Sequence, residues 1–428
     1  MTTAHVRPFA LAPHPLRDVV LGEVHARPFH PLESPRRLLH FAFMTDPARA
    51  AADRAAVASW CVARGIAAPG EGAKHHRAHW VNGSLRWEQH SEFTTFTWEM
   101  SGASDGFTPA AAAVASVMEG IAQPGPLLVA ADLHLVVGGD LDELAGLFDP
   151  ASLAVSQVDG AAVAMTDFRP DAGGFVRILV VDQGLGPARA GALTQRLLEI
   201  ETYRTLALLG LPEAHRISPR IGEIEAGLTR IASAMQAESG LVTDHKLLGE
   251  LTALAATLEA ESARSSYRFG ASRAYDGIVQ QRLVAIRERE VDGWPSIAAF
   301  LSRRMGPAMR TCAMLEDRQA RLSEKLSRAA NLLRTRVDVE IERQNRDLLS
   351  AMNERARMQL RLQQTVEGLS VAAISYYVVG LAGYVFKGAK DAGLLPVDPG
   401  MAMAVAVPVA VLGVALVVRR IRRGHGEP

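Results

Sequence analysis

GLSVAAISYYVVGLAGYVF, residues 368–386, is a run of 19 residues without a charged side chain. A second uncharged run of 19 residues, GMAMAVAVPVAVLGVALVV, follows at residues 400–418. At a rise of about 1.5 Å per residue each run would form a helix roughly 28 Å long, close to the thickness of the hydrocarbon core of a bilayer. We therefore expect two transmembrane helices joined by the short loop 387–399. The alternative is a pair of helices buried in the core of a soluble domain.

The charges that flank these runs predict their orientation. Arginines precede the first run and follow the second, at Arg355, Arg357 and Arg361 and, in the basic tail 419–428, at Arg419, Arg420, Arg422 and Arg423. The loop balances two lysines against two aspartates, at Lys387, Lys390, Asp391 and Asp398. Because basic residues collect on the cytoplasmic side, we expect both termini in the cytoplasm of a bacterium, the loop in the periplasm and the helices in the inner membrane.

Five residues of the first run are candidates for lining a pore or for close helix packing: Ser375, Tyr376, Gly380, Gly383 and Tyr384. Gly380 and Gly383 are three residues apart, and Tyr376 lies four residues before Gly380, so the three share one side of a helix. In a pore, this side would face the axis. In an anchor, the glycines would let the second helix approach through Ala402, Ala406 and Ala410. In either case we expect leucine at position 380 to weaken the hairpin.

Residues 191–367 are expected to be helical, because apolar residues recur at three- and four-residue spacing. After Pro307 no proline occurs before Pro396 and no glycine before Gly368, so one helix is predicted from about Ala308 through the first apolar run. That helix would be on the order of 100 Å long. Its apolar stripe has coiled-coil spacing, at Leu322, Leu326, Ala329, Leu333, Val337, Ile341, Leu348, Met352, Leu362, Val366 and Leu369. The stripe either joins copies of the chain into a homo-oligomer or packs on other helices of the same chain.

Residues 1–190 show the pattern of an α/β domain. Short apolar runs predict strands, as at LLHFAFM (38–44) and LLVAADLHLVVG (127–138), and alanine-rich segments predict helices, at 46–65 and 108–121. Asn82-Gly83 stands between alternating segments, which is typical of a β-hairpin. The predicted fold class is α+β, with a mixed sheet covered by helices over 1–190, a helical region over 191–367 and the C-terminal hairpin.

No pattern in the sequence predicts an enzyme, a cofactor or bound nucleic acid. The formal net charge is zero, and there is no P-loop, nucleophile elbow, HExxH motif or recognisable triad. The chain has two cysteines, Cys61 and Cys312, which favours a reducing compartment. His75, His76 and His79 lack a metal-ligand spacing and are interpreted as solvent-facing strand histidines. Gly184-Leu185-Gly186 is interpreted as a tight turn between a strand and a helix, rather than as an anion site.

A proline-rich segment at residues 14–37 is expected to be extended, and its charged groups either clamp it onto the domain or bind an acidic ligand. The quoted motifs EVHARPFHPLESPRR (23–37), RLLEIETYRTLALLGLP (196–212), RTRVDVEIERQNRDLL (334–349) and RLQQTVEGLSVAAISYYVVGL (361–381) resemble the domain-of-unknown-function 3422 family of bacterial membrane-anchored proteins. The resemblance implies membrane anchoring and no established activity. Within it, Glu23, His25, Arg27 and Pro28 form a candidate motif of unknown role.

The order of parts is also similar to that of CorA-type magnesium transporters, which have a cytoplasmic α/β domain, a long helix and two C-terminal spans. Their Gly-Met-Asn motif is replaced here by Gly383-Tyr384-Val385-Phe386-Lys387, and a lysine there would repel a cation. Our leading hypothesis is an oligomeric inner-membrane protein whose cytoplasmic body is a scaffold, sensor or regulator of unknown ligand. Its partners would be the lipid bilayer and further copies of the chain. A CorA-like channel or transporter is the alternative, and an enzyme with an unrecognised site is a third hypothesis.

Overall fold

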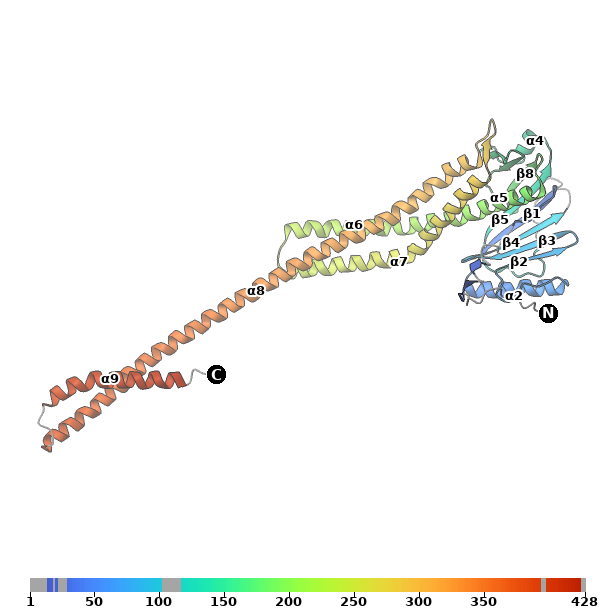
Figure 1. The fold of residues 1–428 in the computed structure, drawn as a ribbon. Helices are drawn as coiled ribbons and strands as arrows, with labels where there is room; N and C mark the ends of the chain where they lie inside the picture. The colour runs from blue at the N-terminus through green and yellow to red at the C-terminus, as the bar shows by residue number, and fades with distance from the viewer. Residues whose placement is uncertain (1–13, 18–19, 22–28, 102–116, 394–397, 425–428) are drawn as a thin grey trace. The chain divides into compact units, whose positions relative to one another are not determined.

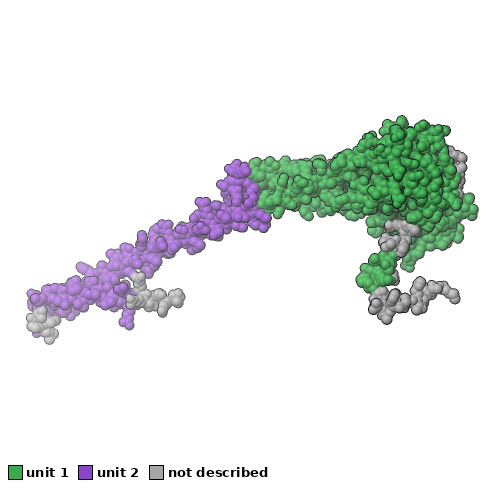
Figure 2. Space-filling view, turned by 45° about the horizontal axis from the view of Figure 1, so that its top comes forward, with its two compact units in different colours: residues 1–233, 250–329 green, residues 234–249, 330–428 purple. Residues whose placement is uncertain are grey.

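The computed structural model describes residues 14–17, 20–21, 29–101, 117–393 and 398–424. The chain divides into two compact units, residues 1–233 with 250–329 and residues 234–249 with 330–428 (Figure 2). The first unit contains the sheet and most of a helical bundle. The second contains the end of the bundle and both long apolar runs.

A nine-stranded mixed sheet forms the base of the first unit (Figure 1). Its strands are β1 (Arg36–Met44), β2 (His75–Trp80), β3 (Gly83–Gln89), β4 (Phe93–Ser101), β5 (Leu127–Val137), β6 (Ala154–Val158), β7 (Ala162–Thr166), β8 (Val176–Asp182) and β9 (Glu288–Glu290). Their order across the sheet is β2-β3-β4-β1-β5-β8-β7-β6-β9, with β5 and β8 parallel. Asn82-Gly83 forms the predicted β2–β3 turn, where Trp80 pairs with Gly83. The predicted mixed sheet is confirmed.

Side-chain alternation gives β1 two different faces. On one face Leu39 and Phe41 join Trp87 and Trp98 in an aromatic core that includes residues of α2 (Pro47–Ala63). On the other face Leu38 packs with leucines of α5 (Pro187–Leu208) and with the neighbouring strand β5. The sheet is therefore covered by α2 on one side and by α5 on the other, as strands with alternating side chains require.

The remaining helices are α4 (Leu141–Ala145) in the sheet domain, then α6 (Gly210–Ala237), α7 (Leu241–Ala285), α8 (Ile297–Asp391) and α9 (Pro399–Gly424). The predicted long helix is confirmed as α8, which begins before Pro307 rather than at about Ala308. Leu301 and Met305 are buried in the core before the proline, and Ala308 is buried directly after it. Burial on both sides of Pro307 holds the helix together although the proline removes one backbone hydrogen bond.

A buried ion pair joins α7 to the sheet. Glu92, in the turn between β3 and β4, accepts hydrogen bonds from Nη1 and Nη2 of Arg268 at 3.1 and 2.5 Å. The side chains of Arg268 and Glu92 are 20% and 10% exposed. Two parallel bonds to one carboxylate fix both distance and orientation, so this pair sets where α7 crosses the end of the sheet.

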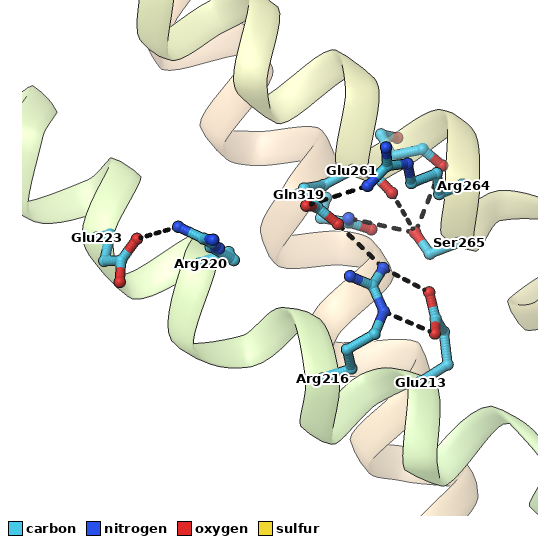
Figure 3. Close-up of polar contacts among 9 residues, drawn as sticks. Glu213, Arg216, Arg220, Glu223, Glu261, Arg264, Ser265 and Gln319 are labelled. Atoms are coloured by element: carbon cyan, nitrogen blue, oxygen red, sulfur yellow. Dashed lines mark hydrogen bonds and ion pairs between the residues drawn. The ribbon is translucent and has the colours of Figure 1, made fainter.

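Polar contacts also connect α6, α7 and α8, which lie side by side in the first unit (Figures 1 and 3). Arg216 of α6 donates to Glu213 on its own helix at 2.8 Å and to Glu261 of α7 at 2.9 Å. Buried Gln319 of α8 donates to the Ser265 hydroxyl of α7 at 3.4 Å. A polar layer between helices lowers stability relative to apolar packing but fixes their register.

In the second unit, α8 caps the end of α6. Arg336 donates to the backbone carbonyl oxygens of Met235 and Glu238 at 2.8 and 3.3 Å. These carbonyls lie at a helix C-terminus, where they lack intrahelical partners and attract a cation. Beyond Val337, the next buried residue of α8 is Ser375.

The apolar stripe of α8 therefore divides at Val337. Leu322, Leu326 and Leu333 are at most 2% exposed, because they pack on helices of the same chain. The later members are 40 to 73% exposed, at Ile341, Leu348, Met352, Leu362, Val366 and Leu369. Packing within the chain accounts for the first part of the stripe, and the second part has no partner in the part of the chain that the structure describes.

The two apolar runs form the end of α8 and most of α9. Both helices are long and apolar enough to cross a membrane by length and composition, and their most apolar stretches are only 6% and 0% buried. The less exposed residues of α9 include Ala402, Ala406 and Ala410, as their four-residue spacing predicts. A Cβ atom on Gly383 of α8 would lie 2.3 Å from Met403 Cε, so the helices are in contact there.

Candidate functional site

The face of β1–β4 on the α5 side is polar, whereas the opposite face is aromatic. The polar side chains that cross-strand register places on this face include Arg77 of β2, Ser84, Arg86 and Glu88 of β3, Thr95, Thr97 and Glu99 of β4, and His40 of β1. Because α5 covers the His40 end of the row, charged groups are enclosed between a helix and a sheet. Buried charged groups are stable only when they are paired or hydrogen-bonded. The partners of these side chains therefore determine which groups are left to bind a ligand.

His40 ties the sheet to α5. Its Nδ1 is 2.8 Å from Thr97 Oγ1, and its Nε2 is 2.9 Å from Thr202 Oγ1. Since the Thr202 hydroxyl donates to the Leu198 carbonyl at 2.8 Å, it accepts from His40, and Nε2 carries the ring proton. Burial lowers the pKa of His40 to about 3, so the imidazole is neutral. At physiological pH, His40 is therefore neutral and connects the sheet to α5 by hydrogen bonds.

Beside His40, Gln195 of α5 links two pairs of charged side chains by hydrogen bonds to one member of each pair. Arg86 Nη1 donates to Gln195 Oε1 at 2.7 Å, and Gln195 Nε2 donates to Glu199 Oε1 at 2.9 Å. Glu199 pairs with Arg282 of α7, and Glu88 Oε2 lies 3.6 Å from Arg86 Nε. Two arginines are thus balanced by two glutamates.

These side chains line a cavity of about 200 Å³, together with His40, Thr95, Thr202, Phe93 and Leu198. His90, also in the lining, stacks on Phe93 with ring centroids 4.1 Å apart. Two buried atoms of the lining, Thr95 Oγ1 and Arg86 Nε, have no hydrogen-bond partner among the described residues. A buried polar group left unpaired costs about 1–3 kcal/mol, so these atoms are the unsatisfied hydrogen-bonding groups of the lining.

The polar row continues into a smaller cavity of about 30 Å³, which has room for a water molecule. There Arg77 Nη2 donates to Glu99 Oε2 at 2.7 Å and to Ser84 Oγ at 3.1 Å. His30 lies on the other side, and burial, together with the charge of Arg77, lowers its pKa. Both polar partners of Arg77 Nη2 are within the protein, whereas its buried Nε has no hydrogen-bond partner among the described residues.

The backbone at the end of the proline-rich segment packs directly against α5. A Cβ atom on Gly191 would lie 1.7 Å from the His30 carbonyl oxygen, which leaves room only for glycine. The Leu32 N–H donates to the Pro187 carbonyl at 2.9 Å. The described part of the segment is therefore held by backbone contacts. The motif residues Glu23, His25, Arg27 and Pro28 lie outside the described residues.

The two other motifs of the sheet domain have structural explanations. His75 and His79 share the polar face of β2, while His76 lies on the other face with Nε2 2.8 Å from the Ala67 carbonyl oxygen. Over the described ranges, no group of three or more His, Cys, Asp or Glu side chains is arranged to hold a metal ion. The amides of Gly184 and Leu185 donate to Asp182 Oδ1 at 2.9 and 2.7 Å, as in a tight turn.

The five candidate residues of the apolar run fall on different sides of α8. Ser375 is 3% exposed, whereas Tyr376 and Tyr384 are each 78% exposed. Nothing lies within 4 Å of a Cβ atom placed on Gly380, although Gly383 contacts Met403. Residues three apart differ by about 60° around a helix, which is enough to separate the two glycines. The expectation that leucine at position 380 weakens the hairpin stays a prediction without a contact in the described structure to support it, and Gly383 is the close contact.

The polar cavity was not predicted from the sequence, although one signal for it exists. Charged and aromatic residues alternate in β3 at Arg86, Trp87 and Glu88. This alternation predicts one polar strand face, and such a face ordinarily meets solvent. That α5 and α7 cover it follows only from the tertiary fold.

The comparisons with known proteins agree with the motifs of the sequence. A family model described as "Protein of unknown function (DUF3422)" matches residues 12–425. The chain belongs to the DUF3422 family. None of the curated proteins compared with the chain matches it.

One solved structure, described as "structure of the full-length CmaX protein", is similar to this DUF3422 member at 14% identity. The alignment covers 69% of this chain and 89% of that chain, with a TM-score of 0.15. A likeness at this score carries no argument about fold or function.

Proposed function

We propose that this DUF3422 protein is anchored in the bacterial inner membrane by α8 and α9 and acts in the cytoplasm as a scaffold, sensor or regulator. The observation that carries the proposal is the exposure of two apolar helix windows, which are only 6% and 0% buried. Apolar surface of this extent is unfavourable in water, and a bilayer removes it from water. The arginines at both ends of the hairpin favour cytoplasmic termini.

Extraction and topology test the anchor. The full chain should stay in the membrane fraction during an alkaline carbonate wash, which strips peripheral proteins. A reporter fused after Pro428 should be active only in the cytoplasm, and one inserted at Leu394 only in the periplasm. Release by the wash, or a periplasmic C-terminus, would contradict the proposal.

Self-association along α8 is the second part of the proposal. From Ile341 to Leu369 the stripe keeps heptad-compatible spacing while its apolar members stay exposed. Anchoring by the same hairpin would hold the α8 helices of different copies parallel and at one depth, as a parallel bundle requires. Polar residues on the stripe, at Gln344, Arg355 and Gln359, would then fix its register.

Ion transport of the CorA type is the second candidate function. It is favoured by the exposure of Tyr376 and Tyr384, whose hydroxyl groups lie within the uncharged run 368–386 of α8. Lys387 and the missing Gly-Met-Asn motif weigh against it. Flux of magnesium, cobalt and potassium into proteoliposomes distinguishes the candidates. Absence of flux for a correctly inserted protein excludes transport, and flux that Tyr376→Phe alters would replace the anchor proposal.

A further inference from the structure

We propose that the cavity lined by β3, β4 and α5 binds a small zwitterion of the α-amino acid class. Arg86 would hold the carboxylate, and Glu88 and Glu199 the ammonium group. The ligand class rests on the proposed function, because a sensor must bind a ligand and the proposed function does not name one. The residues of the site belong to the first unit and the apolar runs to the second, so ligand binding and membrane anchoring can be tested separately.

The charge of the lining favours a ligand that carries both signs. Arg86 and Arg282 are balanced by Glu88 and Glu199, and the side chains of Arg86 and Glu88 are only 16% and 11% exposed. A plain anion or cation would add one uncompensated charge to this enclosed site, which is unfavourable at low local dielectric. A zwitterion leaves the total charge of the site unchanged.

The position of the unused hydrogen-bonding groups supports the same ligand. Arg86 bonds Gln195 through Nη1, which leaves Nε without a hydrogen bond and 3.6 Å from Glu88. A carboxylate beside Nε would replace this loose contact by a charge-assisted hydrogen bond. Thr95, which is 3% exposed, supplies an unpartnered hydroxyl from the next strand. The donors therefore come from two adjacent strands.

The size and the walls of the cavity limit the ligand further. About 200 Å³ is less than the roughly 300–1,000 Å³ of sites for drug-sized molecules, so the ligand is a small metabolite. Phe93 and Leu198 form apolar wall beside the charged groups. An amino acid combines a charged end with a short side chain that such a wall can accept.

The test measures binding by titration calorimetry on the full-length protein in detergent. Each common L-amino acid is titrated in turn, and the tightest is compared with its analogue lacking the amino group and its analogue lacking the carboxylate. For leucine these are 4-methylpentanoate and isopentylamine. We expect one or more amino acids to bind and both analogues to bind at least roughly tenfold more weakly, since each leaves one side of the charge pattern unpaired.

Two variants connect the binding to this cavity. Arg86→Gln should abolish binding, while the matched surface variant Arg220→Gln, whose side chain is 61% exposed on α6, should leave it unchanged. Thr95→Val removes an unpartnered hydroxyl at nearly constant volume. It should keep or raise the unfolding temperature of the free protein while weakening binding about fivefold or more. This variant keeps the proposal testable if Arg86→Gln does not fold.

Three outcomes would overturn the proposal. They are failure of every amino acid to bind, equal binding of the carboxylate-only or amine-only analogue, and unchanged binding by Thr95→Val and Arg86→Gln. The first would make the cavity a water-filled structural feature, and the second a site for a simple ion. None of them affects the extraction and topology results that test the membrane anchor.

Discussion

At the scale of single residues, Asp53 is a carboxyl group placed in the aromatic core under the sheet. It is 3% exposed, and Trp87 Nε1 donates to its Oδ2 at 2.8 Å, while Oδ1 has no partner within the described ranges. Burial raises the pKa of Asp53 from 3.8 to about 6, because the ionised form loses its hydration. Folding therefore favours the protonated form. The stabilising contribution of this group is full below the unfolded value of 3.8 and is lost as the pH rises through about 6.

Asp53→Asn should therefore stabilise the protein at neutral and alkaline pH. Asparagine keeps a carbonyl oxygen to accept from Trp87 and removes the charge. We expect a gain in the free energy of unfolding of about 1–3 kcal/mol near pH 8 and a much smaller one near pH 4, where the native carboxyl is already protonated. Denaturant unfolding followed by tryptophan fluorescence at both pH values measures this. An equal gain at both would show that charge is not the cause.

The two glycines of the apolar run should respond differently to substitution. Gly383→Leu places new atoms against the end of the flexible Met403 side chain and should destabilise the α8–α9 contact by about 1 kcal/mol. Gly380→Leu extends into open space and should leave the hairpin of one chain unchanged. Protease resistance of the hairpin in detergent measures both. If Gly380→Leu is the more disruptive, this face of α8 contacts another copy, as the transport candidate requires.

At the scale of elements, the pair Glu92–Arg268 joins α7 to the sheet. Glu92→Gln leaves the Arg268 charge largely buried without its counter-ion, so we expect a loss of about 2–5 kcal/mol in the free energy of unfolding. Glu250→Gln is the matched control, because Glu250 pairs with Arg230 between α6 and α7 with side chains 37% and 72% exposed. Its effect should stay below about 1 kcal/mol. Similar losses for both variants, measured by denaturant unfolding, would refute the special role of Glu92.

At the scale of the whole molecule, two truncations separate anchoring from self-association. A chain ending at Glu367 lacks both apolar runs and should leave the membrane fraction, but it keeps the exposed stripe from Ile341 to Val366 and should form dimers or larger assemblies. A chain ending at Glu340 keeps the Arg336 contacts with the end of α6 and should be monomeric. Light scattering on the two purified chains gives the mass of each. Two monomers would argue against association along α8, and release only as aggregate would show that folding needs the membrane.

The sequence by itself determined the elements whose signal is local. Two uncharged runs of 19 residues, the absence of proline and glycine between Pro307 and Gly368, and Asn82-Gly83 between alternating segments depend only on neighbouring residues. Periodicity and backbone preference act at that range, so the hairpin turn, the mixed sheet and the long helix were predictable. The family motifs are local in the same sense. By contrast, the start of α8 was misplaced because burial around Pro307 is a property of the assembled core.

Only the tertiary structure decided which of these surfaces are covered. From the sequence, Arg86 and Glu88 are expected on the solvent-facing side of a strand. In the structure α5, which lies about 100 residues later in the chain, covers them and encloses a cavity. The stripe of α8 has one continuous spacing, yet Leu333 is buried and Leu348 is exposed, because α6 and α7 extend along only part of the helix. Gly380 and Gly383 differ in whether they contact α9 for the same reason. Spacing fixes the direction in which a side chain points, and the partner that it meets there is set by contacts between segments far apart in the chain.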